Sequence, residues 1–132
     1  MMHRIVLGVA TSLALAGSAT GAAAGHESPF ACNTHAFTPA EAHRHFEVLG
    51  PKLRAVETRS VELPDGYDFV FPANPTTYRL IAEWAEGERR CCPFFRIEVV
   101  SEAEGGPLHM RLTGRPGVKD FIRTEGAAWI RG

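Results

Sequence analysis

The sequence predicts an α+β fold: a four-stranded antiparallel sheet from two β-hairpins, each followed by a helix, with an additional N-terminal helix. Two stretches of alternating apolar residues, 57–71 and 95–112, each contain turn-forming residues near the middle and so predict the two hairpins. A helix-start signal follows each stretch, and a third one lies ahead of the first stretch. This order allows all the helices to cover one face of the sheet.

Length and charge limit the class of protein. The 132 residues are enough for one domain with an ordinary core, and 45% hydrophobic and 22% charged residues are typical of a globular protein. The formal net charge of −1 gives no electrostatic basis for binding nucleic acid or anionic membranes. The chain has three cysteines, an odd number, which favours a metal ion or another thiol as the partner.

The first 24 residues have the pattern of a bacterial-type signal peptide. The basic pair His3-Arg4 precedes an apolar region at residues 5–17, and Ala22-Ala23-Ala24 fits the A-x-A cleavage pattern. We expect cleavage near Ala24, which leaves residues 25–132 as a single α+β domain that is periplasmic or secreted. The alternative is an uncleaved membrane anchor, for which this apolar region is short. No later stretch is apolar for the ~20 residues that a spanning helix needs.

The first helix is expected to begin at Pro39. Thr38 precedes it as the cap, and Glu41 reaches back to complete a capping box. Pro51 cannot donate a hydrogen bond to the carbonyl of Glu47, so the helix should kink or end at this proline.

Two histidines on this helix, His43 and His45, lie two residues apart and so point in different directions. Each is expected at the surface. His45 is the better candidate ligand, because it neighbours Phe46 and Leu49 on the side that should meet the core.

The first hairpin turns at Pro64-Asp65-Gly66, and aromatic residues alternate along its return strand, 67–71. We interpret this aromatic stripe as the core face of the sheet in preference to a binding face. In the second hairpin, His109 lies on the face opposite the apolar residues and is expected in solvent. A short helix after Pro116 and a docked tail with Trp129 complete the chain.

The central helix is expected to begin at Asn74-Pro75, with asparagine as cap, and to stop before Pro93. Cys91 and Cys92 then occupy its last turn, with Glu88 one turn earlier on the same face.

Two residues of the central helix need an explanation. Gly87 weakens the helix by about 1 kcal/mol relative to alanine, so we expect a packing or functional reason for it. Glu88 is a carboxylate on an otherwise apolar stripe and needs a partner. That partner is Arg89, a residue across the core, or a metal ion, and an ion pair is preferred.

The adjacent cysteines Cys91 and Cys92 favour metal binding over a disulfide between themselves. Neighbouring Cα atoms lie about 3.8 Å apart, whereas disulfides prefer roughly 5.5–6 Å. Two thiolates this close can bind one soft cation, with Cys32 as a third ligand. We therefore expect a site for Cu(I), Hg(II) or a similar ion that serves buffering, transport or detoxification.

Three further residues are candidate ligands, and any of them would complete the tetrahedral set that Zn(II) requires. His35 forms a C-x-x-H motif with Cys32, and His45 and Glu88 lie on the first and central helices. No catalytic residue is predicted. The candidate metal ligands are Cys32, Cys91, Cys92, His35, His45 and Glu88.

Two alternatives remain open at this point. The first is a non-catalytic interaction domain in which Cys32 forms a structural disulfide with Cys91 or Cys92. Such a bond closes a loop of about 60 residues and would stabilise the fold by roughly 4 kcal/mol. The second is a thiol redox protein, against which the helix dipole argues. The C-terminal end of a helix disfavours a thiolate by about 0.3–1 kcal/mol.

Three runs together carry a resemblance: 62–67 (ELPDGY), 88–94 (ERRCCPF) and 112–114 (LTG). They resemble a group of small bacterial proteins of unknown function, whose members are similar over most of residues 25–132. A cysteine ahead of the first helix in that group matches Cys32. The resemblance implies no activity.

Overall fold

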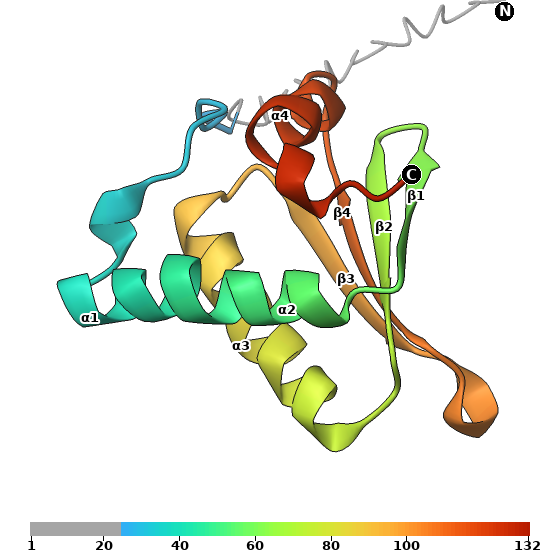
Figure 1. Ribbon diagram of the computed structural model, residues 1–132. Helices are drawn as coiled ribbons and strands as arrows, with labels where there is room; N and C mark the ends of the chain where they lie inside the picture. The colour runs from blue at the N-terminus through green and yellow to red at the C-terminus, as the bar shows by residue number, and fades with distance from the viewer. Residues whose placement is uncertain (1–24) are drawn as a thin grey trace, which may run out of the picture.

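The computed structural model describes residues 25–132, so the signal-peptide prediction for residues 1–24 lies outside the described residues. Figure 1 shows a sheet with its helices gathered on one side. Along the chain the elements are η1 (Thr34–Ala36), α1 (Pro39–Ala42), η2 (His43–Leu49), α2 (Gly50–Val56), β1 (Arg59–Leu63), β2 (Gly66–Phe71), α3 (Pro75–Cys91), β3 (Arg96–Ser101), η3 (Ala103–Gly105), β4 (Leu108–Thr113), α4 (Val118–Glu125) and η4 (Ala127–Trp129).

The four strands form one antiparallel sheet in the order β1-β2-β4-β3, so the two hairpins meet along β2 and β4. Phe69 of β2 pairs with Met110 of β4, which in turn pairs with Val99 of β3. This register aligns the apolar residues of three strands on one face. The predicted α+β fold, with a helix after each hairpin and an additional N-terminal helix, is confirmed.

The N-terminal helix begins with the predicted capping box. The Thr38 side chain accepts a hydrogen bond from the Glu41 amide, and the Glu41 carboxylate accepts one from the Thr38 amide. The helix then continues past Pro51 to Val56 as η2 and α2, and so does not end at the proline. The reason is that η2 is a π-helical segment, in which the Gly50 amide donates to the carbonyl of His45, five residues earlier. The wider turn accommodates a proline without a regular i→i−4 bond.

The central helix α3 also has its predicted ends. The Asn74 side chain accepts a hydrogen bond from the Thr77 amide, and Pro75 occupies the first helical position. The last helical residue is Cys91, and Cys92 follows as the C-cap with φ −123° and ψ 66°. Cys92 therefore leaves the helix axis, which lets its side chain and that of Cys91 point into the same region.

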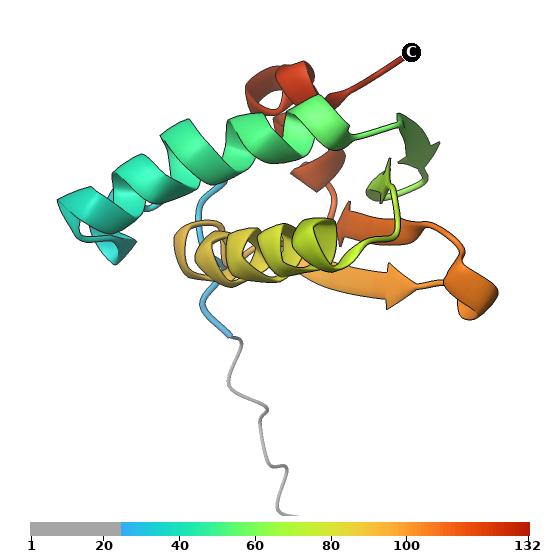
Figure 2. The same cartoon turned by 60° about the horizontal axis from the view of Figure 1, so that its bottom comes forward.

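The core lies between the sheet and α3, with the long N-terminal helix crossing α3 (Figures 1 and 2). The aromatic stripe of β2 is on the core face, as predicted, with Tyr67, Phe69 and Phe71 at most 4% exposed. The prediction for His109 is wrong: it is buried on the opposite face, where its Nδ1 lies 2.8 Å from Asp68 Oδ2. A carboxylate on the neighbouring strand thus replaces solvent as its partner.

Glu57, directly after α2, is a buried carboxylate whose burial is only weakly compensated by polar contacts. Among the described residues neither of its carboxylate oxygens has a hydrogen-bond partner, and Arg131 Nε lies 3.5 Å from Oε2. Burial raises the pKa of Glu57, and the charge of Arg131 opposes this only in part. A raised pKa means that the folded state prefers the protonated form, so stability is lost as pH rises through that pKa.

Replacing Glu57 with glutamine is therefore expected to stabilise the protein at neutral pH by about 1 kcal/mol, because it removes a buried charge that is poorly paired. The advantage should shrink below about pH 4, where the wild-type carboxyl is protonated too. Urea unfolding of both proteins at several pH values measures this difference. A variant that is less stable than the wild type at neutral pH would show that the ion pair with Arg131 is worth more than the burial costs.

No helix in the part of the chain that the structure describes combines the length and the apolar character needed to cross a membrane.

Candidate metal centre

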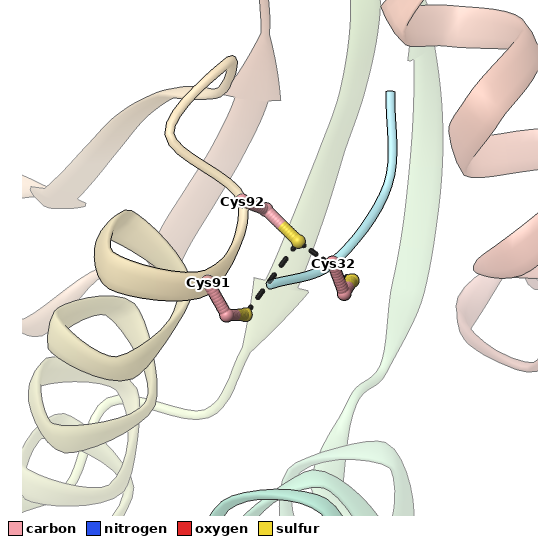
Figure 3. A group of neighbouring side chains, drawn as sticks. All are labelled: Cys32, Cys91 and Cys92. Atoms are coloured by element: carbon pink, nitrogen blue, oxygen red, sulfur yellow. Dashed lines mark hydrogen bonds between the residues drawn. The ribbon is translucent and has the colours of Figure 1, made fainter. Parts of the chain in front are cut away.

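The three cysteines converge on one point from two distant segments of the chain (Figure 3). Cys92 Sγ lies 2.7 Å from Cys32 Sγ and 3.5 Å from Cys91 Sγ, and all three sulfurs are within 4.8 Å of one another. All three are free thiols, and the disulfide of the structural alternative is not formed. Cys32 is exposed, whereas Cys91 and Cys92 are buried.

The N-terminal arm, residues 25–33, is fixed beside the end of α3 by contacts on both sides of Cys32. The amide of Asn33 donates to the carbonyl of Cys91 at 2.7 Å. On the other side, the Phe30 ring packs edge-on against Phe94, with centroids 5.3 Å apart. Arg115 lies over the Phe30 ring at 4.2 Å and also donates to the carbonyl of Ser28. The hydrogen bonds and ring contacts on both sides of Cys32 thus fix its position beside the end of α3.

The three thiols share hydrogen bonds in a way that favours one thiolate, on Cys32. Hydrogen bonds from Cys91 and Cys92 lower the pKa of Cys32 to about 3. The same interaction with Cys32 raises the pKa of both Cys91 and Cys92 above the usual range of a thiol. At neutral pH the cluster therefore contains one negative sulfur and two protonated ones. The C-terminal end of α3 disfavours a thiolate on Cys91 or Cys92, whereas Cys32 lies off the helix.

Iodoacetamide is expected to alkylate Cys32 first, at a rate that changes little between about pH 5 and pH 8, because the thiolate is fully formed above its pKa of about 3. Mass mapping of the early product at several pH values measures both features. A rate that rises about tenfold per pH unit would instead indicate an ordinary thiol.

A second group of ligand atoms adjoins the sulfurs. His45, Glu88 and Cys91 also have ligand atoms within 4.8 Å of one another. His45 Nε2 lies 2.9 Å from Glu88 Oε1, and both side chains are buried. The expectation that His45 lies at the surface is wrong, because its ring is stacked between Phe37 and Trp84, at 5.0 and 5.6 Å. Of the three partners considered for Glu88, the structure shows the residue across the core, which is His45.

The His45 ring explains why position 87 of α3 is a glycine. A Cβ atom at position 87 would lie 2.4 Å from His45 Nδ1, so any side chain there would displace the imidazole from Glu88.

Replacing Gly87 with alanine is expected to destabilise the protein by about 2 kcal/mol, since the added methyl group overpacks a buried site. An exposed glycine in a helix would show the opposite effect, a gain of about 1 kcal/mol. Urea unfolding measures the sign. The exposed position Ala82 supplies the control, because Ala82→Gly loses only helix propensity. Stabilisation by Gly87→Ala would contradict the role given to Gly87.

Of the six candidate ligands, the structure places Cys32, Cys91 and Cys92 together and His45 and Glu88 beside them. His35 is exposed on η1 and belongs to neither group of close ligand atoms. The burial of His45 could not be predicted from the sequence alone. Gly87, one turn of α3 from Cys91, was the signal that a bulky side chain packs against the helix there.

A cavity of about 230 Å³ opens directly beside the sulfurs. Cys32, Cys92, His45 and Glu88 form one part of its lining. Half of the other lining residues are aromatic, and Arg54 and Glu125 are charged. These aromatic residues are Phe46, Phe69, Trp84, Phe95, Phe121 and Trp129.

Comparison with known proteins gave no match to a family model, a curated protein or a solved structure. The geometry of the cysteine cluster is therefore the basis for the functional conclusion.

Proposed function

We propose that the protein is an exported thiol protein that binds one soft metal ion through Cys32, Cys91 and Cys92, for buffering, transport or detoxification. One observation carries the proposal: three free sulfurs from segments about 60 residues apart lie within 4.8 Å of one another. Soft thiolate ligands select thiophilic ions over Mg²⁺ or Ca²⁺. Export is part of the proposal through the signal-peptide pattern of residues 1–24.

The ligand set favours Cu(I) or Hg(II) over Zn(II). A structural zinc site needs four ligands, and the fourth would have to be His45 or Glu88. Those two side chains are 2.9 Å apart and already satisfy each other. Recruiting either one would leave its partner buried without a hydrogen bond, at a cost of about 1–3 kcal/mol. Three sulfurs without a fourth ligand suit a trigonal soft ion.

The site also has an entry route and a first point of attachment. Cys32 is exposed and ionised, so an incoming ion can bind this sulfur first. Cys91 and Cys92 then lose their protons to the solvent as they bind. The three sulfurs already lie within 4.8 Å of one another, so binding requires side-chain adjustments and no large movement of the helix.

Titration of the reduced protein with Cu(I) and Hg(II), in competition with a chelator of known affinity, tests the proposal. The Cys91→Ser/Cys92→Ser double variant should lose tight binding of both ions. His35→Ala should bind like the wild type, since His35 is in neither group of close ligand atoms. Equal uptake by the wild type and the double variant would refute the proposal.

A thiol redox protein is the second candidate, and the ionised Cys32 beside Cys92 favours it. The Cys32 thiolate would attack a substrate disulfide and release one substrate thiolate. Cys92 would then lose its proton and attack the Cys32 sulfur, which forms a Cys32–Cys92 disulfide and releases the second substrate thiolate. Cys92→Ser should trap the mixed disulfide on Cys32. Absence of any trapped species, with glutathione disulfide as the probe, would exclude this candidate.

A further inference from the structure

The cavity beside the cysteine cluster is larger and more apolar than a site for a bare metal ion requires. An ion held by three sulfurs within 4.8 Å of one another would lie inside the cluster and fill none of the cavity's 230 Å³. The residues Cys32 and Cys92 nevertheless belong to the cavity wall. A group attached to the metal would therefore extend directly into the cavity.

The aromatic part of the cavity wall is suited to a flat apolar group. Trp84 and Trp129 approach with ring centroids 4.9 Å apart, and Phe69 lies 5.8 Å from Trp129. The Arg54 guanidinium lies over the Trp129 ring, 5.5 Å from its centroid, which helps to hold this tryptophan in position. Aromatic side chains bind rings by offset stacking and edge contacts, in addition to excluding water.

The charge of the site favours the same kind of ligand. An organomercury cation R–Hg⁺ carries one positive charge, which one cysteine thiolate of the cluster neutralises in the bound state. Their adduct is neutral, so it can lie against an apolar wall without the cost of burying a net charge.

We propose that the cysteine cluster and the adjoining cavity together bind soft metal ions that carry an organic substituent, with arylmercury as the chemical class. This inference rests on the proposed metal-binding function. In the binding step the Cys32 thiolate forms a bond to mercury and displaces the ligand that brought it, a chloride or a carrier thiolate, which leaves with its electron pair. The carbon–mercury bond stays intact, and the aryl ring occupies the cavity against Trp84 and Trp129.

Competition with glutathione tests this inference, with phenylmercury, methylmercury and Hg(II) as the three probes. Glutathione offers no apolar cavity. The ratio of the protein's affinity to the affinity of glutathione for each probe therefore cancels the intrinsic thiol affinity of that probe. The wild type should prefer phenylmercury over methylmercury by about thirtyfold, because a phenyl ring buries more apolar surface than a methyl group.

Two variants separate the cavity from the metal site. Leu112→Phe fills the cavity from β4, and Trp129→Ala removes part of the aromatic wall, with Trp129→Phe as its matched control. Both cavity variants should lose the preference for phenylmercury and keep the Hg(II) affinity of the wild type, whereas Trp129→Phe should retain most of the preference. Leu112→Phe keeps the test decisive if Trp129→Ala does not fold.

The outcomes distinguish this inference from the proposed function. Loss of Hg(II) binding in the Cys91→Ser/Cys92→Ser variant, together with an unchanged phenyl-to-methyl ratio in Leu112→Phe, would overturn the organometal inference alone. Hg(II) binding that does not depend on the cysteines would overturn the proposed function, and this inference with it.

Discussion

Replacing Cys32 with serine is expected to weaken the binding of Hg(II) and Cu(I) by more than about a hundredfold. Removal of a group that only orients a metal ligand costs 10- to 100-fold, and Cys32 is proposed as a ligand itself. It also supplies the thiolate that is present before the metal arrives, because its pKa is about 3. The variant would have to bind the ion through two thiols that are both protonated at neutral pH.

The measurement is a competition titration of both proteins with a strong chelator. Thr34→Ala is the control, because Thr34 is exposed and lies only two residues from Cys32 on the same segment. It should bind the metal as the wild type does. An affinity for Cys32→Ser within about threefold of the wild type would remove Cys32 from the site and leave only a two-cysteine one.

The affinity for the metal should rise about 100-fold per pH unit between roughly pH 5.5 and pH 7.5, because binding displaces two protons. Hydrogen bonding to Cys32 raises the pKa of Cys91 and of Cys92, so both stay protonated over this range until a metal binds. Cys32 has no proton to lose, since its pKa is about 3. Calorimetry in buffers of different ionisation enthalpy counts the protons directly.

The pH dependence of metal binding by the Cys32→Ser variant is a second test of this prediction. It should keep the slope of about 100-fold per pH unit while its affinity falls, because the two remaining thiols still release two protons. A wild-type slope of about 1,000-fold per unit would mean that three protons are released and that Cys32 is not ionised beforehand.

The features that could be predicted from sequence are those that depend on neighbouring residues. The capping box of Thr38 and Glu41 and the start of α3 at Pro75 each need only a few consecutive residues. The placement of Cys91 in the last turn of α3 follows from Pro93, which cannot continue the helix. The alternation of apolar residues identified the strands. Because the strands form two hairpins, only a few strand orders are possible for the sheet.

Features that depend on long-range packing were not accessible in this way. The helix passes Pro51 because the π-helical segment before it changes the hydrogen-bonding partners, which residue types alone do not specify. His45 is buried because Phe37, Trp84 and Gly87 together enclose its ring, and Phe37 lies far along the chain from the two residues of α3.

The site shows the same division. The clustering of Cys32 with Cys91 and Cys92 was predicted, and soft-metal binding there stays a prediction. The contacts that hold Cys32 in place, made by Phe30 and Arg115, could not be predicted because these residues are far apart in the chain. The cavity was not predicted at all, since its wall combines residues from helices, strands and the C-terminal tail. The docked tail with Trp129 was the one sequence feature that pointed toward it.

The most direct test of the three-cysteine site is X-ray absorption spectroscopy of the reduced protein loaded with one equivalent of Hg(II). Three sulfur neighbours in the first coordination shell are expected, falling to two in Cys32→Ser. A first shell of two sulfurs in the wild type, or one dominated by nitrogen and oxygen, would contradict a site built from Cys32, Cys91 and Cys92.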